Sequence, residues 1–172
     1  MNIEYLNECD REAFVTALEG IYEETTWMAE DAFTRRPFRD VPALKSALRK
    51  CVDARTLAER LALVRAHPEL AGEKAAALAL SHESTQEQRG AGLLVMEGEP
   101  LERLRALNTA YREKFGFPFV IAVKGPDGQG LSLETIVATL QQRLAFTQEA
   151  ALAESLEQTH LIAALRLDGR VP

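Results

Sequence analysis

Residues 40–51 read DVPALKSALRKC, and the spacing of their apolar side chains decides the fold class. Leu44, Leu48 and Cys51 recur at intervals of four and three residues, which places them on one side of an α-helix. Asp40 is a residue type that caps helix N-termini, and the proline two residues later is tolerated in the first helical turn. The stretch therefore predicts an amphipathic helix with an apolar face in the core.

The same helical period recurs along most of the chain. Asp10 and Ser132 each precede a further periodic stretch, so both are predicted N-caps. We expect an all-α fold in which residues 1–172 form a single domain, a bundle of about eight helices. The expected helices span residues 10–21, 40–51, 56–66, 70–80, 84–115 with an interruption near 98–100, 132–146 and 147–167.

One segment departs from the helical period. Residues 117–123 read FPFVIAV, a short apolar run that predicts buried extended chain. Residues 125–130, GPDGQG, then predict a loop. This loop lacks the spacing and the Gly-Lys-Ser/Thr ending of a P-loop, so it does not indicate a nucleotide site.

Composition excludes several classes of function. The chain has 20 basic and 26 acidic residues, so its formal charge of -6 provides no footprint for a nucleic acid. Cys9 and Cys51 are too few for a disulfide framework and have no metal-ligand spacing, which favours a reducing cytoplasm and no metal site. No export signal or bilayer-spanning run is present, so we expect a soluble cytoplasmic protein without a membrane partner.

His67 differs from the other two histidines. Pro68 disfavours helical backbone at the preceding residue, so His67 is expected at a helix-ending corner, where its ring can act as a proton donor. In the alternative interpretation, His67 only satisfies the end of the preceding helix. His82 and His160 lie on polar stretches and are predicted to be solvated.

Two further candidates also have competing interpretations. Ser84-x-x-Glu87 matches the capping box, in which both side chains serve the start of a helix. In the functional interpretation, that helix start binds an anionic or carbonyl-rich ligand while Glu87 accepts from ligand N–H groups. Arg166 either complements the negative end of the last helix or clamps a carboxylate or carbonyl group.

Several motifs occur in a specific order. They are HPELAG at 67–72, S-x-x-EQ at 84–88, AGL at 91–93 and N-x-x-Y-x-x-KFGFPFVI at 108–121. Together they resemble the OHCU decarboxylases, which act on 2-oxo-4-hydroxy-4-carboxy-5-ureidoimidazoline. The resemblance covers nearly the whole chain, from Leu6-Asn7 through Glu23, Trp27 and Arg36-Pro37-Phe38 to Arg166-Leu167. The sequence departs from the family at Glu24-Thr25-Thr26, where His-Ser-Pro is more usual, and at Ala145, where an asparagine is frequent.

The resemblance implies roles for individual residues. His67 matches the catalytic proton donor, and Glu87 and Arg166 match polar active-site residues. The substrate-contacting residues that it implies are Pro68, Ser84, Thr85, Gln86, Glu87, Gln88, Phe119, Val120, Ile121, Ala122 and Val123. It further implies a homodimer that acts after urate oxidase and hydroxyisourate hydrolase.

The substrate of this family explains why we expect no cofactor. Its carboxylate leaves a ring carbon next to a C=N bond, and that bond can accept the electron pair without pyridoxal or thiamine. Two alternatives remain open. One is hydrolysis of a ureide or cyclic amide with Ser84 as nucleophile and His67 as base. The other is a helical module that binds ureides without turnover.

Overall fold

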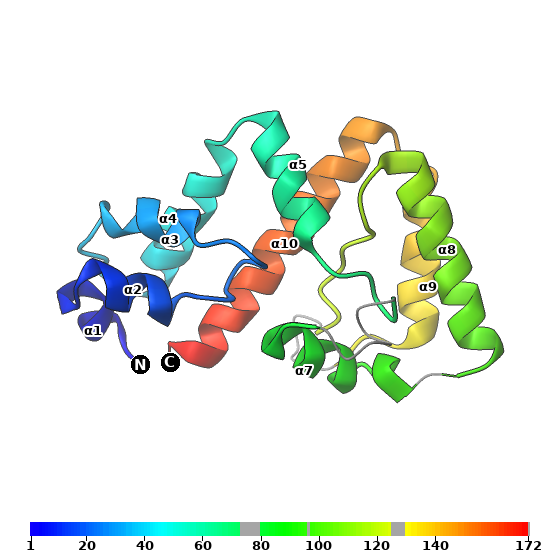
Figure 1. Ribbon diagram of the computed structural model, residues 1–172, viewed down its shortest axis with the longest axis horizontal. Helices are drawn as coiled ribbons and strands as arrows, with labels where there is room; N and C mark the ends of the chain where they lie inside the picture. Colours follow the sequence, from blue (N-terminus) through cyan, green and yellow to red (C-terminus); the bar gives the residue numbers. More distant parts are fainter. Residues whose placement is uncertain (73–79, 96, 125–129, 172) are drawn as a thin grey trace. The chain divides into compact units, whose positions relative to one another are not determined.

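The computed structural model describes residues 1–72, 80–95, 97–124 and 130–171. Within these ranges it contains nine α-helices, one 3-10 turn and no β-strand, which confirms the predicted all-α fold (Figure 1). The predicted helix at 70–80 and the loop at 125–130 lie largely outside the described residues. The elements are α1 (Ile3–Glu8), α2 (Arg11–Ala17), α3 (Trp27–Phe33), α4 (Val41–Asp53), α5 (Leu57–Ala66), α7 (His82–Gly90), η1 (Leu93–Val95), α8 (Glu99–Phe115), α9 (Leu133–Arg143) and α10 (Gln148–Arg170).

The helices form two compact units. The first consists of Met1–Leu63 and His160–Pro172, and the second of Val64–Thr159. Helix α10 contributes its first part to the second unit and its last part to the first. The stretches that carry His67, Glu87 and residues 119–123 therefore belong to the second unit, whereas Arg166 belongs to the first.

The predicted N-caps are confirmed by side-chain hydrogen bonds. Asp10 accepts from the backbone N–H of Ala13 at 2.8 Å, and Asp40 accepts from that of Ala43 at 2.7 Å. Ser132 caps α9 in the same way. Each oxygen satisfies a donor that has no partner inside its own helix, so these polar residues fix where α2, α4 and α9 begin.

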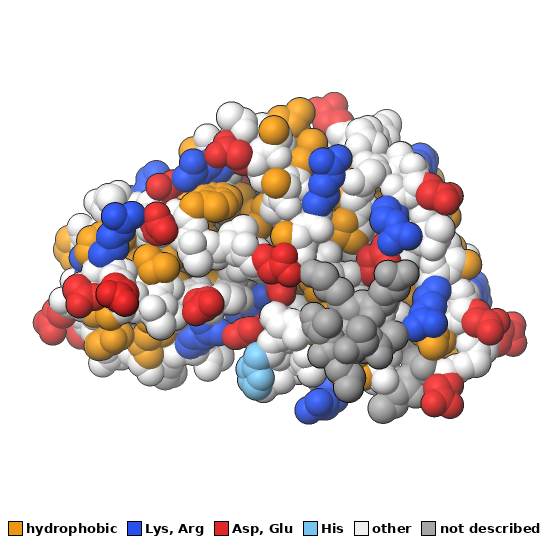
Figure 2. Space-filling view, in the orientation of Figure 1, with side chains coloured by type: hydrophobic (Ala, Val, Ile, Leu, Met, Phe, Trp, Pro, Cys, Tyr) orange, Lys and Arg blue, Asp and Glu red, His pale blue; other side chains and the backbone are white. Residues whose placement is uncertain are grey.

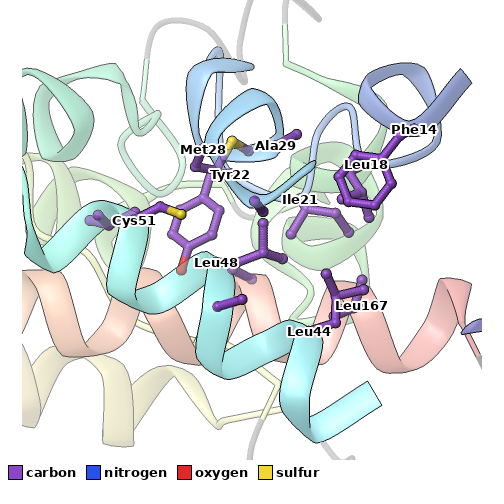
Figure 3. Close-up of a cluster of buried hydrophobic side chains, with 14 of the residues drawn as sticks. Phe14, Leu18, Ile21, Tyr22, Met28, Ala29, Leu44, Leu48, Cys51 and Leu167 are labelled. Atoms are coloured by element: carbon purple, nitrogen blue, oxygen red, sulfur yellow. The ribbon is translucent and has the colours of Figure 1, made fainter. Parts of the chain in front are cut away.

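The core of the first unit forms around α4. Leu44, Leu48 and Cys51 are buried, as their period predicts. They gather with Phe14, Leu18, Ile21, Tyr22, Met28, Ala29 and Leu167 in one apolar cluster (Figure 3). Helix α3 packs against both α2 and α4. Burial of this apolar surface is the main favourable contribution to the stability of the unit.

A polar contact joins two segments of the first unit that are distant in sequence. The Asn7 side-chain amide donates from Nδ2 to the carbonyl of Phe38 and accepts at Oδ1 from the Phe38 N–H, both at 2.8 Å. Nearby, Arg36 Nη1 donates to three carbonyls at the end of α1, those of Leu6, Asn7 and Cys9. These bonds satisfy main-chain groups that helices leave without partners.

The second unit has an aromatic core. Tyr111 of α8 is fully buried, and its ring centroid lies 4.6 Å from that of Phe115, 6.1 Å from that of Phe117 and 5.4 Å from that of Phe119. The burial raises the pKa of the Tyr111 phenol. Helix α8 packs along α9 (Figure 1). The predicted segment 117–123 is buried, as expected, and these rings hold its first half against α8.

Helix α7 ends earlier than the sequence predicted. The expected helix ran from 84 to an interruption near 98–100, but α7 stops at Gly90, and η1 lies between α7 and α8. The chain turns at Gly92 and Gly98, whose φ angles of 72° and 68° are in the left-handed region that favours glycine. The two glycines therefore divide the expected long helix.

The surface carries charges of both signs. On the face shown in Figure 2, acidic and basic side chains are interspersed among the described residues. Among the described helices, none is both long enough and apolar enough to cross a membrane.

The Asn7 contact allows a direct measurement. We expect Asn7→Ala to lower the free energy of unfolding by about 1–3 kcal/mol, because two hydrogen bonds to Phe38 are lost. Asn7→Asp should lower it at least as much, since the oxygen that replaces Nδ2 is repelled by the Phe38 carbonyl. Chemical denaturation of the three proteins tests this order. Equal stability of wild type and Asn7→Ala would show that the contact contributes nothing.

Candidate functional site

His67 lies where α5 ends. The helix stops at Ala66, and the His67 N–H donates to the carbonyl of Val64 at 3.2 Å, one turn back. Pro68 follows and prevents the helical path from continuing. The predicted corner is therefore confirmed. His67 is 9% exposed as a residue, and both of its ring nitrogens are buried.

Helix α7 begins one turn before the predicted start. Its N-cap is Ser81, whose hydroxyl accepts from the backbone N–H of Ser84 at 3.2 Å, and the helix begins at His82. The capping-box interpretation of Ser84 and Glu87 is therefore wrong. Ser84 is the third helical residue and is buried, whereas Glu87 lies half-buried in the second turn. Glu87 is thus too far along the helix to cap its start.

The side chain of Gln88 has a role that sequence reasoning missed. Its Oε1 accepts from the Ala71 N–H at 2.9 Å, and its Nε2 donates to the Glu69 carbonyl at 3.3 Å. These bonds join α7 to the turn that follows His67. The structure therefore brings two of the predicted stretches together, the one at 67–72 and the one at 84–88.

The third predicted stretch, residues 119–123, is held by polar side chains from α9 and α10. Arg143 donates to the Val120 carbonyl at 2.8 Å, and Gln158 accepts from the Ala122 N–H at 2.9 Å. Among the described residues, no hydrogen-bonding partner is found for the main-chain groups of Ile121, although this residue is only 7% exposed. Such groups are normally paired when buried, so they are suited to bind a planar polar ligand.

Arg143 is itself buried, and we count it among the candidate site residues because it contacts the stretch at 119–123. Its guanidinium lies 5.1 Å from the centroid of the Phe119 ring and pairs with Glu154 at 2.9 Å. Burial lowers the pKa of Arg143, and the charge of Glu154 opposes this shift. No sequence pattern marks this contact, because Arg143 reads as an ordinary basic residue in the last turn of α9.

Arg166 lies in the first unit, where it forms a buried ion pair. Its Nη1 donates to Glu23 Oε2 at 2.9 Å and to the Gly20 carbonyl at 2.8 Å. The side chains of Arg166 and Glu23 are 4% and 3% exposed. The prediction that Arg166 only complements the negative end of the last helix does not describe its position, because its guanidinium is held by the buried Glu23 carboxylate.

His160 contradicts its predicted solvated position. It is buried, its Nδ1 lies 2.7 Å from the Tyr22 hydroxyl, and its Nε2 lies 3.2 Å from Asp53 Oδ1. Burial raises the pKa of Tyr22, so the phenol stays protonated. His82 is exposed, as predicted.

Comparison with known proteins decides the family. The family model described as OHCU decarboxylase matches residues 7–168. The chain belongs to the OHCU decarboxylase family. The match includes all of the predicted site residues, from His67 to Arg166, and extends over both units.

Individual known proteins are similar to the chain over nearly its whole length. The 2-oxo-4-hydroxy-4-carboxy-5-ureidoimidazoline decarboxylase of Halalkalicoccus jeotgali is 35% identical over 168 residues, which are 98% of this chain and 90% of that protein. A uric acid degradation bifunctional protein of Bacillus sp. is 32% identical and covers 97% of this chain, but the chain covers only 32% of that protein.

A solved structure of an (S)-allantoin synthase superposes with a TM-score of 0.76 at 26% identity. It covers 100% of this chain, and the chain spans 54% of that solved protein, about half of its length.

Among the described residues of our structure, no group of three or more His, Cys, Asp or Glu side chains is placed to hold a metal ion.

The corrected start of α7 can be tested at Ser81. We expect Ser81→Ala to lower the free energy of unfolding by about 1 kcal/mol, because the Ser84 N–H loses its acceptor. Ser81→Asp keeps an acceptor and adds a negative charge at the helix N-terminus, so it should retain wild-type stability. Thermal and chemical unfolding measure both. An unchanged free energy of unfolding in Ser81→Ala would show that Ser81 does not cap the helix.

Proposed function

We propose that this protein decarboxylates 2-oxo-4-hydroxy-4-carboxy-5-ureidoimidazoline and yields (S)-allantoin and CO₂. The observation that carries the proposal is the family match over residues 7–168, which contains His67, Glu87 and Arg166. The relative from Halalkalicoccus jeotgali, named for this activity, supports it because the two chains match along nearly their whole lengths. Residues 1–172 would then work as one catalytic domain.

The reaction shifts electron pairs within the substrate and takes up one proton overall. The bond between the carboxylate and the hydroxyl-bearing ring carbon breaks, and its electron pair forms a C=C bond to the neighbouring ring carbon. The former C=N pair moves to the ring nitrogen, which takes a proton. The resulting enol loses its hydroxyl proton to become a carbonyl, while the ureido-bearing carbon gains a proton on one face. No oxidant or reductant is involved.

His67 is suited to move these protons. Pro68 fixes the corner on which it stands, and burial of the ring nitrogens keeps bulk water away from the proton that is transferred. In our proposal His67 handles the hydroxyl proton and supplies or relays the proton that creates the (S) centre. A donor held on one side of a planar intermediate gives one enantiomer.

Glu87 and the first turns of α7 supply the polar contacts. In our proposal the Glu87 carboxylate, which lies in the second turn of α7 and not at its cap, binds the ureido and ring N–H groups of the substrate. Residues 84–88 would line the same side of the ligand. The hydrolase alternative needs Ser84 as an exposed nucleophile, and its burial at 3% exposure does not favour that role.

Residues 119–123 complete the proposed binding surface. The Ile121 N–H and carbonyl can pair with the edge of the flat ring, since Arg143 and Gln158 already bind the flanking residues. The apolar side chains of this stretch disfavour the localised charge of the carboxylate more than the dispersed charge of the transition state. This arrangement would promote loss of CO₂ without a cofactor.

Arg166 is proposed to orient a carbonyl or carboxylate oxygen of the substrate. Glu23 and the Gly20 carbonyl fix one end of the guanidinium. This preorganisation lowers the entropy that a flexible arginine loses on binding.

The setting of the enzyme follows from the same proposal. We expect a cytoplasmic homodimer that takes its substrate from hydroxyisourate hydrolase, downstream of urate oxidase. The similarity to a uric acid degradation bifunctional protein supports this place in urate breakdown.

The first test combines the wild-type activity with a His67 variant. Wild-type protein should accelerate formation of optically active allantoin from freshly generated substrate, followed by circular dichroism with spontaneous decay subtracted. His67→Asn should lower kcat by about 10²–10⁴-fold, the usual contribution of a general acid or base. His82→Asn changes an exposed histidine and serves as the control. Near-wild-type turnover by His67→Asn would exclude His67 as the proton donor.

The second test concerns Arg166. Arg166→Ala would leave the Glu23 carboxylate buried without its partner, at a cost of about 3–5 kcal/mol, so it would report on folding. Arg166→Lys keeps the charge and removes the planar fork. We expect KM to rise about tenfold or more while kcat changes little. Arg103→Lys, on the exposed face of α8, is the matched control. An unchanged KM in Arg166→Lys contradicts the clamp.

A further inference from the structure

We propose that Gln88 and Asn108 are positioning residues, whose side-chain amides hold the turn after His67 in its catalytic geometry. The inference rests on the proposed role of His67. It gives Gln88 a different role from the one that its place in the substrate-contacting stretch suggests.

Gln88 binds the turn through both ends of its amide. It is 2% exposed, and its bonds to the Ala71 N–H and the Glu69 carbonyl measure 2.9 and 3.3 Å. A side chain whose oxygen and nitrogen both face the turn is directed at protein. Its neighbour Glu87 is half-buried, so adjacent residues of α7 have different surroundings.

Asn108 binds the same turn from a different helix. It lies in α8, is 2% exposed and donates from Nδ2 to the Leu70 carbonyl at 2.9 Å. Arg105 of the same helix donates to the Ala71 carbonyl at 3.1 Å, and Arg112 pairs with the Glu69 carboxylate at 2.6 Å. Three consecutive residues of the turn are therefore bound by side chains from α7 and α8.

The turn needs this support because its backbone is strained. Ala71 has a φ of 51°, a left-handed conformation that residues with a Cβ rarely adopt. The turn is also tight, since a Cβ added at Gly72 would lie 2.8 Å from the Cβ of Glu69. Such a conformation persists only where surrounding contacts fix it. The two amides bind the carbonyls of Glu69 and Leu70, the two residues before Ala71, and the N–H of Ala71 itself.

Pro68 couples the position of the turn at 69–71 to the orientation of the His67 ring. His67 is two residues before Glu69, and the proline between them restricts the backbone, so a movement of the turn changes the direction of the imidazole. Gln88 also links this turn to the helix that carries Glu87. Loss of either amide should therefore misplace the proton donor while leaving the substrate contacts in place.

Gln88→Ala tests the proposal through kcat, KM and hydrogen exchange. We expect kcat to fall about ten- to hundredfold, as for a displacement of a catalytic group by about 1 Å, with KM within about twofold of wild type. The Ala71 amide should exchange faster in NMR-detected exchange, because it loses its acceptor. Gln142→Ala makes the same change on the exposed face of α9 and should behave as wild type.

Two conservative variants keep the test decisive if Gln88→Ala folds poorly. Gln88→Glu retains an acceptor for the Ala71 N–H but cannot donate to the Glu69 carbonyl when ionised, so slow exchange at Ala71 should persist with an intermediate kcat. Asn108→Asp replaces the donor to the Leu70 carbonyl by a carboxylate and should lower kcat without raising KM.

Other outcomes overturn the proposal. A raised KM with unchanged kcat in Gln88→Ala would show that this side chain binds substrate. Wild-type kcat together with wild-type exchange at Ala71 would show that the amide does not hold the turn. If the wild-type protein itself does not decarboxylate the substrate, the proposed function fails, and the positioning of a catalytic His67 fails with it. Exchange at Ala71 still separates the two failures, because it reports on the tether without turnover.

Discussion

Pro68 imposes the constraint on which the second unit depends. Helix α5 cannot continue past Ala66 at this point, so the chain leaves the helix at His67 and turns tightly through residues 69–72. The turn leaves main-chain groups that no helix satisfies. Gln88 and Asn108 bind them, and in doing so they fix α7 and α8 relative to the histidine. Packing of the aromatic rings around Tyr111 then places the stretch at 119–123 against α8.

Local signals predicted most of the fold. The spacing of Leu44, Leu48 and Cys51 correctly predicted a buried helix face. Asp10 and Asp40 correctly predicted where two helices begin. Both signals are local, because helical period and capping depend on residues a few positions apart. The start of α7 was misplaced by one turn. Ser81 and Ser84 are both suitable caps, and the glutamate at 87 favoured the second, whereas the structure uses the first. Short motifs that overlap cannot be separated by pattern alone.

The candidate site was predicted less completely, because its contacts join distant parts of the chain. His160 looked solvated beside polar neighbours, although Leu156, Ala163 and Leu167 recur around it at helical spacing and are buried. That period was the missed signal. No comparable signal marks Glu23 as the partner of Arg166, or Gln158 and Arg143 as the residues that hold 119–123, since each pairing depends on tertiary structure. The motif order pointed to His67 and Glu87 but not to what positions them.

The side-chain amides of Gln88 and Asn108 make the turn after His67 less sensitive to ionic strength. Gln88 and Asn108 are uncharged, so dissolved ions do not screen their bonds to the Glu69, Leu70 and Ala71 main chain. The pair between Arg112 and Glu69 does respond to screening, because the arginine side chain is 53% exposed. Concentrated salt would thus weaken the outer contact and leave the inner ones intact. The bonds that the two neutral amides make to the turn therefore persist across very different electrolytes.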